Sequence, residues 1–238
     1  MGALTRQVKA MFKVACGNNQ LVARDALLGN MRRIRWLVLA VIPLNLLFVA
    51  IFWWFADPVD TRQLAWTKAS GWTHLAMALW MGLCGVVAHR AVVRAAGSLH
   101  GQVLQVIAPL GALLFTVAMT TIDQWVTPSI SPYLLGSAFV SLAVLMRPVV
   151  AVTTHLLAFA AFYVCLALTQ HDLVHLLSNR LNGFSAMVLG IVLGSVAALY
   201  AAADHALSEA KKLGRNRVEK TEPDGSLTPS DFQRMRRT

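Results

Sequence analysis

Charged residues are scarce in this chain of 238 residues: Asp, Glu, Lys and Arg make up 13% of it, against about a quarter of an average soluble domain. Cysteine is scarce as well, with three residues, and this excludes a small scaffold held together by disulfides. The composition is neither polar nor strictly periodic, which excludes disordered and collagen-like chains. Hydrophobic residues instead make up 57% of the chain, and a membrane protein with several spans is the class that remains.

Six apolar runs contain no Lys, Arg, Asp or Glu, and they cover residues 36–56, 71–88, 103–122, 133–146, 149–168 and 184–203. A bilayer core about 30 Å thick needs about 20 apolar residues in a helix. The fourth run spans only about 21 Å at 1.5 Å per residue. It must therefore tilt little, thin the bilayer, extend to Pro132 and Arg147, or form a re-entrant hairpin with the fifth. The sequence predicts an all-α polytopic membrane protein with six transmembrane helices.

Basic residues are distributed unequally between the segments that connect these runs. Alternate segments hold 18 and 3 of the 21 Lys and Arg residues. By the positive-inside rule, both termini lie in the cytoplasm and the loops 57–70, 123–132 and 169–183 lie outside. The net charge of +10 is therefore explained by membrane topology, and no nucleic-acid partner is expected.

The charge pattern divides the chain into four parts. These are a basic, amphipathic N-terminal segment (1–35), a six-helix transmembrane domain (36–203), a helical extension in the cytoplasm (204–213) and a basic tail (214–238). The N-terminal segment predicts a helix on the inner leaflet. In the tail, a capping pattern at Thr228 predicts the start of another helix. The tail is thus either flexible or the beginning of an output domain that this chain lacks.

Asn45, His74 and His155 lie inside the apolar runs, where a polar side chain of this kind needs a partner. Asn45 follows Pro43 by two residues, and its amide is expected to bond the carbonyl that this proline frees. His74 and His155 lie at different depths, so they cannot bind one ion together. Each is expected to form an interhelical hydrogen bond. His74 lies closer to the outer loops and has the stronger claim to a functional role.

The outer loops hold a dense set of polar residues that predicts a ligand-binding rim. The candidate residues are Asp123, Tyr133, Asn179, Arg180, Asn182 and His74. Arg180 would attract an anionic group, and Asp123 could orient that group or a cation. The alternative is that these are solvated loop residues, with Asn182 or Ser185 capping the sixth helix.

Two histidines in the last outer loop suggest a weaker alternative, a metal site. His171 and His175 are four residues apart, so they would share a face if the connection were helical, with Asp172 or Asp123 as a third ligand. Any two histidines in a polar loop fall at this spacing fairly often. No metal or other cofactor is therefore expected.

The sixth run carries small residues at four-residue steps: Gly190, Gly194, Ala198 and Ala202. Such a face allows close helix packing. No helix breaker follows before Leu213, so the helix is expected to continue into the cytoplasm as a signal relay. The alternative is that the small face only packs against the other five spans.

Short polar signatures between the runs resemble a known family. They are residues 123–134 (DQWVTPSISPYL), 168–170 (LTQ) and 177–183 (LSNRLNG), together with 31–35 (MRRIR), His74 and the turn Arg147-Pro148. Over residues 30–205 the chain is similar to the six-helix membrane region of bacterial diguanylate cyclase receptors with GGDEF output domains. The resemblance implies a dimeric sensor in the inner membrane that relays a cue to a domain making cyclic di-GMP.

The chain departs from that family after Leu213. Gly214 and Pro223 interrupt the helix, and no GGDEF signature follows. These 238 residues hold no catalytic motif. The expected partners are the lipid bilayer, a second copy of the chain, a small ligand and a cytoplasmic output domain. The rival function is a small transporter or channel. It is disfavoured because no span carries an acidic residue and the two halves show no repeat.

Overall fold

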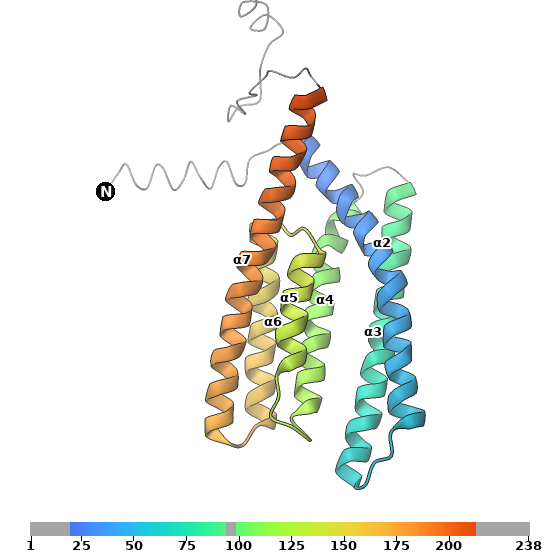
Figure 1. The fold of residues 1–238 in the computed structure, drawn as a ribbon, viewed down its shortest axis with the longest axis vertical. Helices are drawn as coiled ribbons and strands as arrows, with labels where there is room; N and C mark the ends of the chain where they lie inside the picture. Colours follow the sequence, from blue (N-terminus) through green and yellow to red (C-terminus); the bar gives the residue numbers. More distant parts are fainter. Residues whose placement is uncertain (1–19, 94–98, 213–238) are drawn as a thin grey trace, which may run out of the picture. The chain divides into compact units, whose positions relative to one another are not determined.

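The computed structural model describes residues 20–93 and 99–212, which form helices and short connections without a strand (Figure 1). The elements are α2 (Gln20–Ala50), the π-helix η1 (Ile51–Phe55), α3 (Thr61–Val93), α4 (Leu99–Asp123), α5 (Ser131–Ala143), α6 (Pro148–Thr169) and α7 (Leu173–Lys212). The part of the predicted N-terminal helix before residue 20 and the helix predicted at Thr228 lie outside the described residues.

Every predicted apolar run forms a helix, so the all-helical fold is confirmed. Among the described residues, five helices are long and apolar enough to cross a membrane, and α5 is a shorter apolar helix of 13 residues. Of the alternatives for this short run, the extension occurs only at its start: α5 includes Pro132 but does not reach Arg147, because Val144 already has extended backbone angles. Pro148 is the first residue of α6, as predicted.

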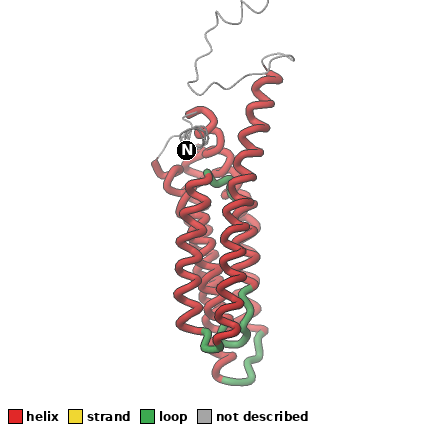
Figure 2. Tube along the Cα trace, turned by 90° about the vertical axis from the view of Figure 1, so that its left-hand side faces the viewer, coloured by secondary structure: helices red, strands yellow, loops and turns green. Residues whose placement is uncertain are grey.

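Residues Arg24–Ala201 form one compact unit, in which α4 packs against α3, α5 and α6 (Figure 1). The helices run lengthwise and are joined by short loops (Figure 2). Two apolar clusters form its core. The first joins α4, α5 and α6 through residues that include Leu113, Tyr133, Val140, Ala158 and Phe162. The second joins α2, α3 and α4 through residues that include Met31, Ile34, Cys84, Ala88 and Leu104.

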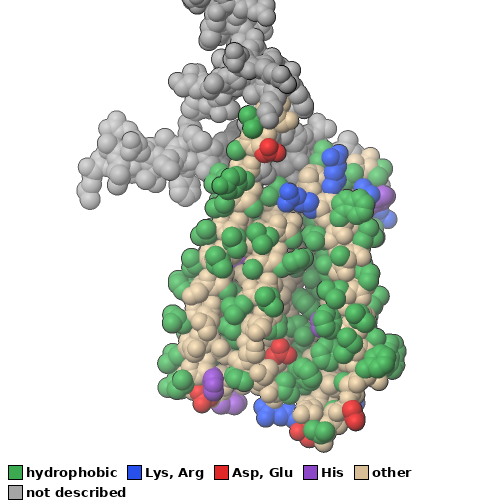
Figure 3. Space-filling view, in the orientation of Figure 1, with side chains coloured by type: hydrophobic (Ala, Val, Ile, Leu, Met, Phe, Trp, Pro, Cys, Tyr) green, Lys and Arg blue, Asp and Glu red, His purple; other side chains and the backbone are tan. Residues whose placement is uncertain are grey.

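The surface of this unit is apolar as well. Many large hydrophobic side chains are exposed, for example Leu135 and Leu168 at 71% and 73%. In the space-filling view, hydrophobic side chains run along the length of the visible face, and most charged ones gather near its ends (Figure 3). A face of this kind is suited to lipid rather than water, because large apolar patches are rare on soluble monomers. Together with their length, this surface makes the described helices compatible with a membrane.

Side chains from distant parts of the sequence fix the turn between α5 and α6. Asn30 of α2 is 1% exposed, and its amide makes two hydrogen bonds with the backbone of Leu145. Its Nδ2 donates to the Leu145 carbonyl at 2.7 Å, and its Oδ1 accepts from the Leu145 N–H at 3.0 Å. The turn leaves these backbone groups outside a helix, so the buried Asn30 satisfies them.

Two predicted details of the helices are wrong. The Asn45 amide donates to the carbonyl of Val41 at 2.8 Å, whereas the carbonyl that Pro43 frees belongs to Leu39, four residues before it. The helix α7 begins at Leu173, about ten residues before the sixth apolar run. Its first turn is capped by Asp172, whose Oδ1 accepts the N–H of His175 at 2.9 Å. Asn182 and Ser185 therefore lie inside the helix and do not cap it.

Candidate functional site

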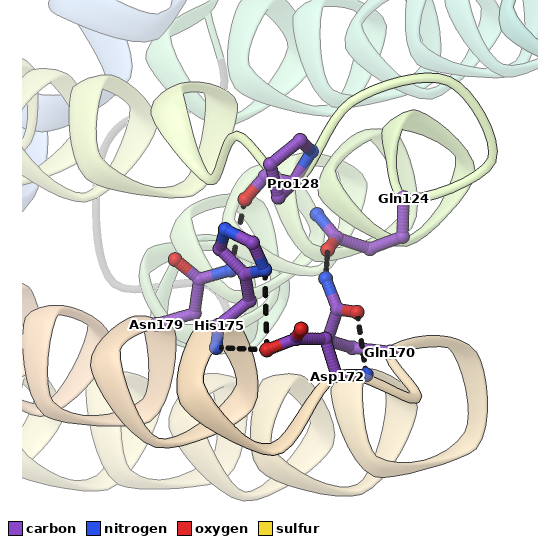
Figure 4. A network of polar contacts seen from close by, with 6 residues as sticks. All are labelled: Gln124, Pro128, Gln170, Asp172, His175 and Asn179. Carbon is purple, nitrogen blue, oxygen red and sulfur yellow. Dashed lines mark hydrogen bonds and ion pairs between the residues drawn. The ribbon is translucent and has the colours of Figure 1, made fainter.

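Polar side chains converge where the α4–α5 loop meets the connection between α6 and α7. We call this set the loop network; its members are Gln124, Pro128, Gln170, Asp172, His175 and Asn179 (Figure 4). It joins the end of α6 and the first turns of α7 to the loop that follows α4.

Gln124 is the centre of one side of this network and is 8% exposed. Its Nε2 donates to the carbonyl of Ser129 at 2.9 Å, so Gln124 connects the start of the α4–α5 loop to its end. Its Oε1 accepts from Nε2 of Gln170 at 3.1 Å. One buried amide therefore fixes both the α4–α5 loop and the end of α6.

Asn179 connects the same loop to α7. It is 8% exposed, and its Nδ2 donates to the carbonyl of Pro128 at 2.8 Å. Pro128 lies between α4 and α5, so its carbonyl has no partner within a helix and is available to a side chain from another element. The predicted rim residue Asn179 is thus a structural contact between α7 and the α4–α5 loop.

Asp172 and His175 form the exposed edge of the network. Asp172 Oδ1 lies 3.3 Å from Nδ1 of His175, and the Asp172 N–H donates to Oε1 of Gln170 at 3.1 Å. The hydrogen bond that Asp172 accepts from the His175 backbone lowers the pKa of this carboxyl group, and the His175 ring lowers it further. The carboxylate is therefore ionised at neutral pH.

A metal site at His171 and His175 required both residues to lie on one helix, and they do not. His171 precedes the first residue of α7, so it does not share a helical turn with His175. In the described part of the chain, no group of three or more His, Cys, Asp and Glu residues is placed to hold a metal ion.

Arg180 lies on α7 beside the ring of Tyr163 on α6. Its guanidinium carbon is 3.7 Å from the ring centroid, which is a cation–π contact. Its Nε is buried and has no hydrogen-bond partner among the described residues. The predicted anion-attracting group is therefore partly desolvated and keeps an unused donor.

Tyr133 does not line an open pocket, although the sequence placed it on the rim. Its side chain is fully buried and stacks on Phe162 with 4.4 Å between ring centroids. Its hydroxyl group has no hydrogen-bond partner among the described residues. Asn182, by contrast, is exposed and lines a shallow pocket of about 330 Å³ with Ser185 of α7 and Leu134 and Ala138 of α5.

Asp123 and His74 belong to a separate group formed by α2, α3 and α4. Asp123 Oδ1 accepts from Nε1 of Trp66 at 3.0 Å, and the Trp66 ring meets Phe52 edge to face at 5.2 Å. His74 is 8% exposed, and its Nδ1 lies 2.8 Å from Oδ1 of Asn45. The interhelical hydrogen bond predicted for His74 is confirmed.

Aromatic rings surround His74 on several sides. Phe48 and Phe52 stack on it at 4.7 Å and 5.7 Å, and Phe115 meets it at 5.5 Å. We call His74, Asn45 and these three rings the His74 cluster. It is a hydrogen-bonded polar pair packed against three aromatic rings.

His155 occupies a tighter position between α5, α6 and α7. Its Nδ1 donates to the carbonyl of Ala151 at 2.9 Å, and its Nε2 lies 3.0 Å from Oγ of Ser141. The interhelical hydrogen bond predicted for His155 is thus confirmed, with Ser141 as the partner that the sequence alone did not identify.

The small face of α7 packs against α5 and α6 of the same chain. A Cβ on Gly190 would overlap the His155 ring and come 2.7 Å from Oγ of Ser137, and one on Gly194 would lie 3.2 Å from the Met146 methyl group. Ala198 is half-buried, and the side chain of Ala202 is outside the described set. The predicted packing role is confirmed for the two glycines.

The predicted rim residues therefore divide into separate groups. Asn179 joins α7 to a loop, Arg180 stacks on Tyr163, Asn182 lines a shallow pocket, Tyr133 is in the core, and Asp123 and His74 lie in the α2–α3–α4 region. Trp66 and Asn30 were missed as site residues. Their indole and amide groups, which lie a few residues before an apolar run, were the only available signal for them.

Comparisons with protein-family models, with curated proteins and with solved structures found no match to this chain.

Proposed function

We propose that this chain is a transmembrane sensory domain of a bacterial inner membrane. A small ligand or membrane cue received at the outer loops alters α7, which passes the change to a cytoplasmic output. The proposed output is a diguanylate cyclase domain of the GGDEF class that is absent from this chain. In this proposal the chain crosses the membrane six times, and both termini lie in the cytoplasm.

The observation that carries this proposal is the contact between Asn179 and Pro128. It attaches the first part of α7 to the outer loop, and α7 then runs without a break to Lys212. A helix transmits displacement or rotation along its axis because each turn is hydrogen-bonded to the next. A change in the loop therefore has a direct mechanical route to the end of α7.

The unequal distribution of charge supports the proposed orientation. Arg32, Arg33 and Arg35 precede the first apolar run, whereas the segment 57–70 between the first two runs holds two acidic and two basic residues and carries no net charge. Cysteine labelling in intact cells tests it, with the three native cysteines replaced by Ala. We expect an impermeant maleimide to modify Asp60→Cys and to leave His89→Cys unmodified until the cells are opened.

Arg180 supports an anionic ligand. Its unused Nε donor and its position near the start of α7 would let an anion shift the contact with Tyr163. Asn182 and Ser185 line a separate shallow pocket that does not include Arg180. The proposed ligand is thus a small anion. Asp123 is not proposed as its partner, because the Asp123 carboxylate accepts a hydrogen bond from Trp66.

The proposed homodimer must use a surface other than the Gly190–Gly194 face, since that face is occupied by α5 and α6. Leu199 and Tyr200 on α7 are 61% and 75% exposed. They are close to the point where α7 continues beyond the apolar run, which suits a contact between two copies.

A fusion experiment tests the proposal. A GGDEF cyclase domain is joined in helical register after Lys212, and cyclic di-GMP is measured in cells. Asn179→Ala should change basal output at least about fivefold, since it detaches α7 from the loop, and Ser178→Ala on the same turn is the matched control. Equal output from both variants, with equal protein levels, would argue against the relay.

A further inference from the structure

A groove of about 430 Å³ lies between α2 and α3, on the side of the bundle away from the loop network. We call it the basic groove. Its polar lining consists of Arg35, His89 and Arg90, and its apolar lining includes Trp36, Val38 and Ile42. None of these residues takes part in the sites described above.

Two glycines of α3 line this groove and face α2. A Cβ on Gly85 would lie 3.0 Å from Val38, and one on Gly82 would have a methyl group of Ile42 at 3.8 Å as its nearest neighbour. The glycines therefore let α3 approach α2 closely, and they leave the wall on the α3 side without side chains at these two positions. The apolar part of the groove is lined by side chains of α2, by Val86 and by these two glycines.

The polar residues of the groove have no partners of their own. Arg35, His89 and Arg90 make no hydrogen bond or ion pair with another described residue, and no Asp or Glu lines the groove. Two permanent positive charges thus face the same space, Arg35 from the start of the first apolar run and Arg90 from the last turn of α3. Unpaired charges beside hydrocarbon are costly, so a complementary anion would be stabilising here.

The shape of the groove selects among anions. A soluble anion would use only the arginines, but Val38, Ile42, Gly82 and Gly85 extend the lining along the helices, away from the charges. Trp36 is 73% exposed beside Arg35, and tryptophan is enriched at the level of lipid headgroups. Basic pockets between transmembrane helices bind anionic lipid headgroups for this reason.

We propose that the basic groove binds one anionic phospholipid, with its phosphate between Arg35 and Arg90 and an acyl chain over Gly82 and Gly85. This site needs the helices to lie in a bilayer, and it does not depend on the proposed sensory role.

Native mass spectrometry of the full chain in detergent tests the proposal. The probes are phosphatidylglycerol and phosphatidylcholine with identical acyl chains. We expect one tightly held phosphatidylglycerol and at least a tenfold preference over phosphatidylcholine. The double variant Arg35→Gln/Arg90→Gln should lose about tenfold or more of this affinity, since each basic group near an anionic surface contributes about 1 kcal/mol.

The matched control is Arg32→Gln/Arg33→Gln. It makes the same change in net charge on exposed residues of α2 that do not line the groove. We expect it to keep the phosphatidylglycerol affinity within about twofold of the unmodified chain. An equal loss in both double variants would mean general attraction to a basic surface, and it would overturn the proposal, as would equal binding of the two lipids.

Two further measurements test the position of the acyl chain. Gly82→Leu keeps both arginines but fills the wall, and it should weaken phosphatidylglycerol binding several-fold, whereas millimolar glycerol phosphate should not displace the lipid. Phosphatidylglycerol brominated on its acyl chain should quench Trp36 more than the matching phosphatidylcholine does. The fluorescence of Trp36 is obtained as the difference between the unmodified chain and Trp36→Phe. This quenching experiment therefore needs no arginine variant. Displacement by glycerol phosphate, or equal quenching by both lipids, would contradict the proposed site.

Discussion

The two buried histidines lie in different environments. His155 is fully buried between α5, α6 and α7, with Ser141 and the Ala151 carbonyl as partners and Gly190 against its ring. His74 is paired with Asn45, and phenylalanine rings cover it.

The difference shows two ways to hold an imidazole away from water. Around His155, a glycine brings α7 close enough for hydroxyl groups and carbonyls to satisfy the ring. Around His74, one amide satisfies one nitrogen, and large apolar rings fill the remaining space. The first arrangement depends on close helix packing, whereas the second can adjust through side chains. We therefore expect the α5–α6–α7 region to tolerate substitution less well.

The largest effect is expected for Gly190→Ala. The new methyl group would overlap His155 and Ser137, and overpacking of this kind costs up to about 3 kcal/mol of unfolding free energy. Gly29→Ala is the matched control, since a Cβ there meets nothing within 4 Å; it should be neutral or stabilising by up to about 1 kcal/mol. Unfolding in detergent, followed by thiol-reactive dye, measures both. Equal stability would show that α7 does not pack closely on His155.

Asn30→Ala tests whether the two regions depend on each other. Asn30 is on α2, and it bonds the turn between α5 and α6. Its loss leaves two backbone groups of Leu145 without partners, at a cost of about 2 kcal/mol. Asn182→Ala, at an exposed position of α7, should cost less than about 0.5 kcal/mol. If the same denaturation assay gave the two variants equal stability, the α2 contact would be dispensable.

The same substitution at both histidines compares the two environments directly. His155→Phe removes two ring hydrogen bonds at a tightly packed position and should cost about 1.5 kcal/mol, near the upper end of values measured for such bonds in membranes. His74→Phe loses one bond but adds a ring to an aromatic cluster, so we expect about 0.5 kcal/mol. A reversed order of thermal midpoints would contradict the comparison.

The smallest effect is a pH dependence at Asp172. Its pKa is below the ordinary value of 3.8, mainly because it accepts the N–H of His175. A lowered pKa in the folded chain means that the carboxylate stabilises the fold above pH 3.8, and that this contribution is lost as the pH falls through the folded value. Asp172→Asn should therefore flatten the change in thermal midpoint between pH 6 and pH 3. If the thermal midpoint of Asp172→Asn changed with pH as much as that of the unmodified chain, Asp172 would not be the cause of the pH dependence.

The helices were predictable because a bilayer-spanning helix leaves a long run without charges. Their ends were harder to predict: α7 begins at Leu173 because Asp172 caps it, and polar residues such as Asn179 and Arg180 are tolerated in its first turns. The partners of polar side chains were mostly not predictable. Whether Gln124 meets Gln170, or Asn30 meets Leu145, depends on how each helix is rotated about its axis, and sequence periodicity alone does not fix that rotation.

The central claim is that α7 carries a signal as a continuous helix, and a series of insertions tests it most directly. One to seven alanines are placed after Lys212 in the cyclase fusion, and cyclic di-GMP is measured for each length. Each residue turns the helix by about 100°, so output should rise and fall with insertion length and return near its starting value at seven. Output that is the same at every length would contradict a rigid helical relay.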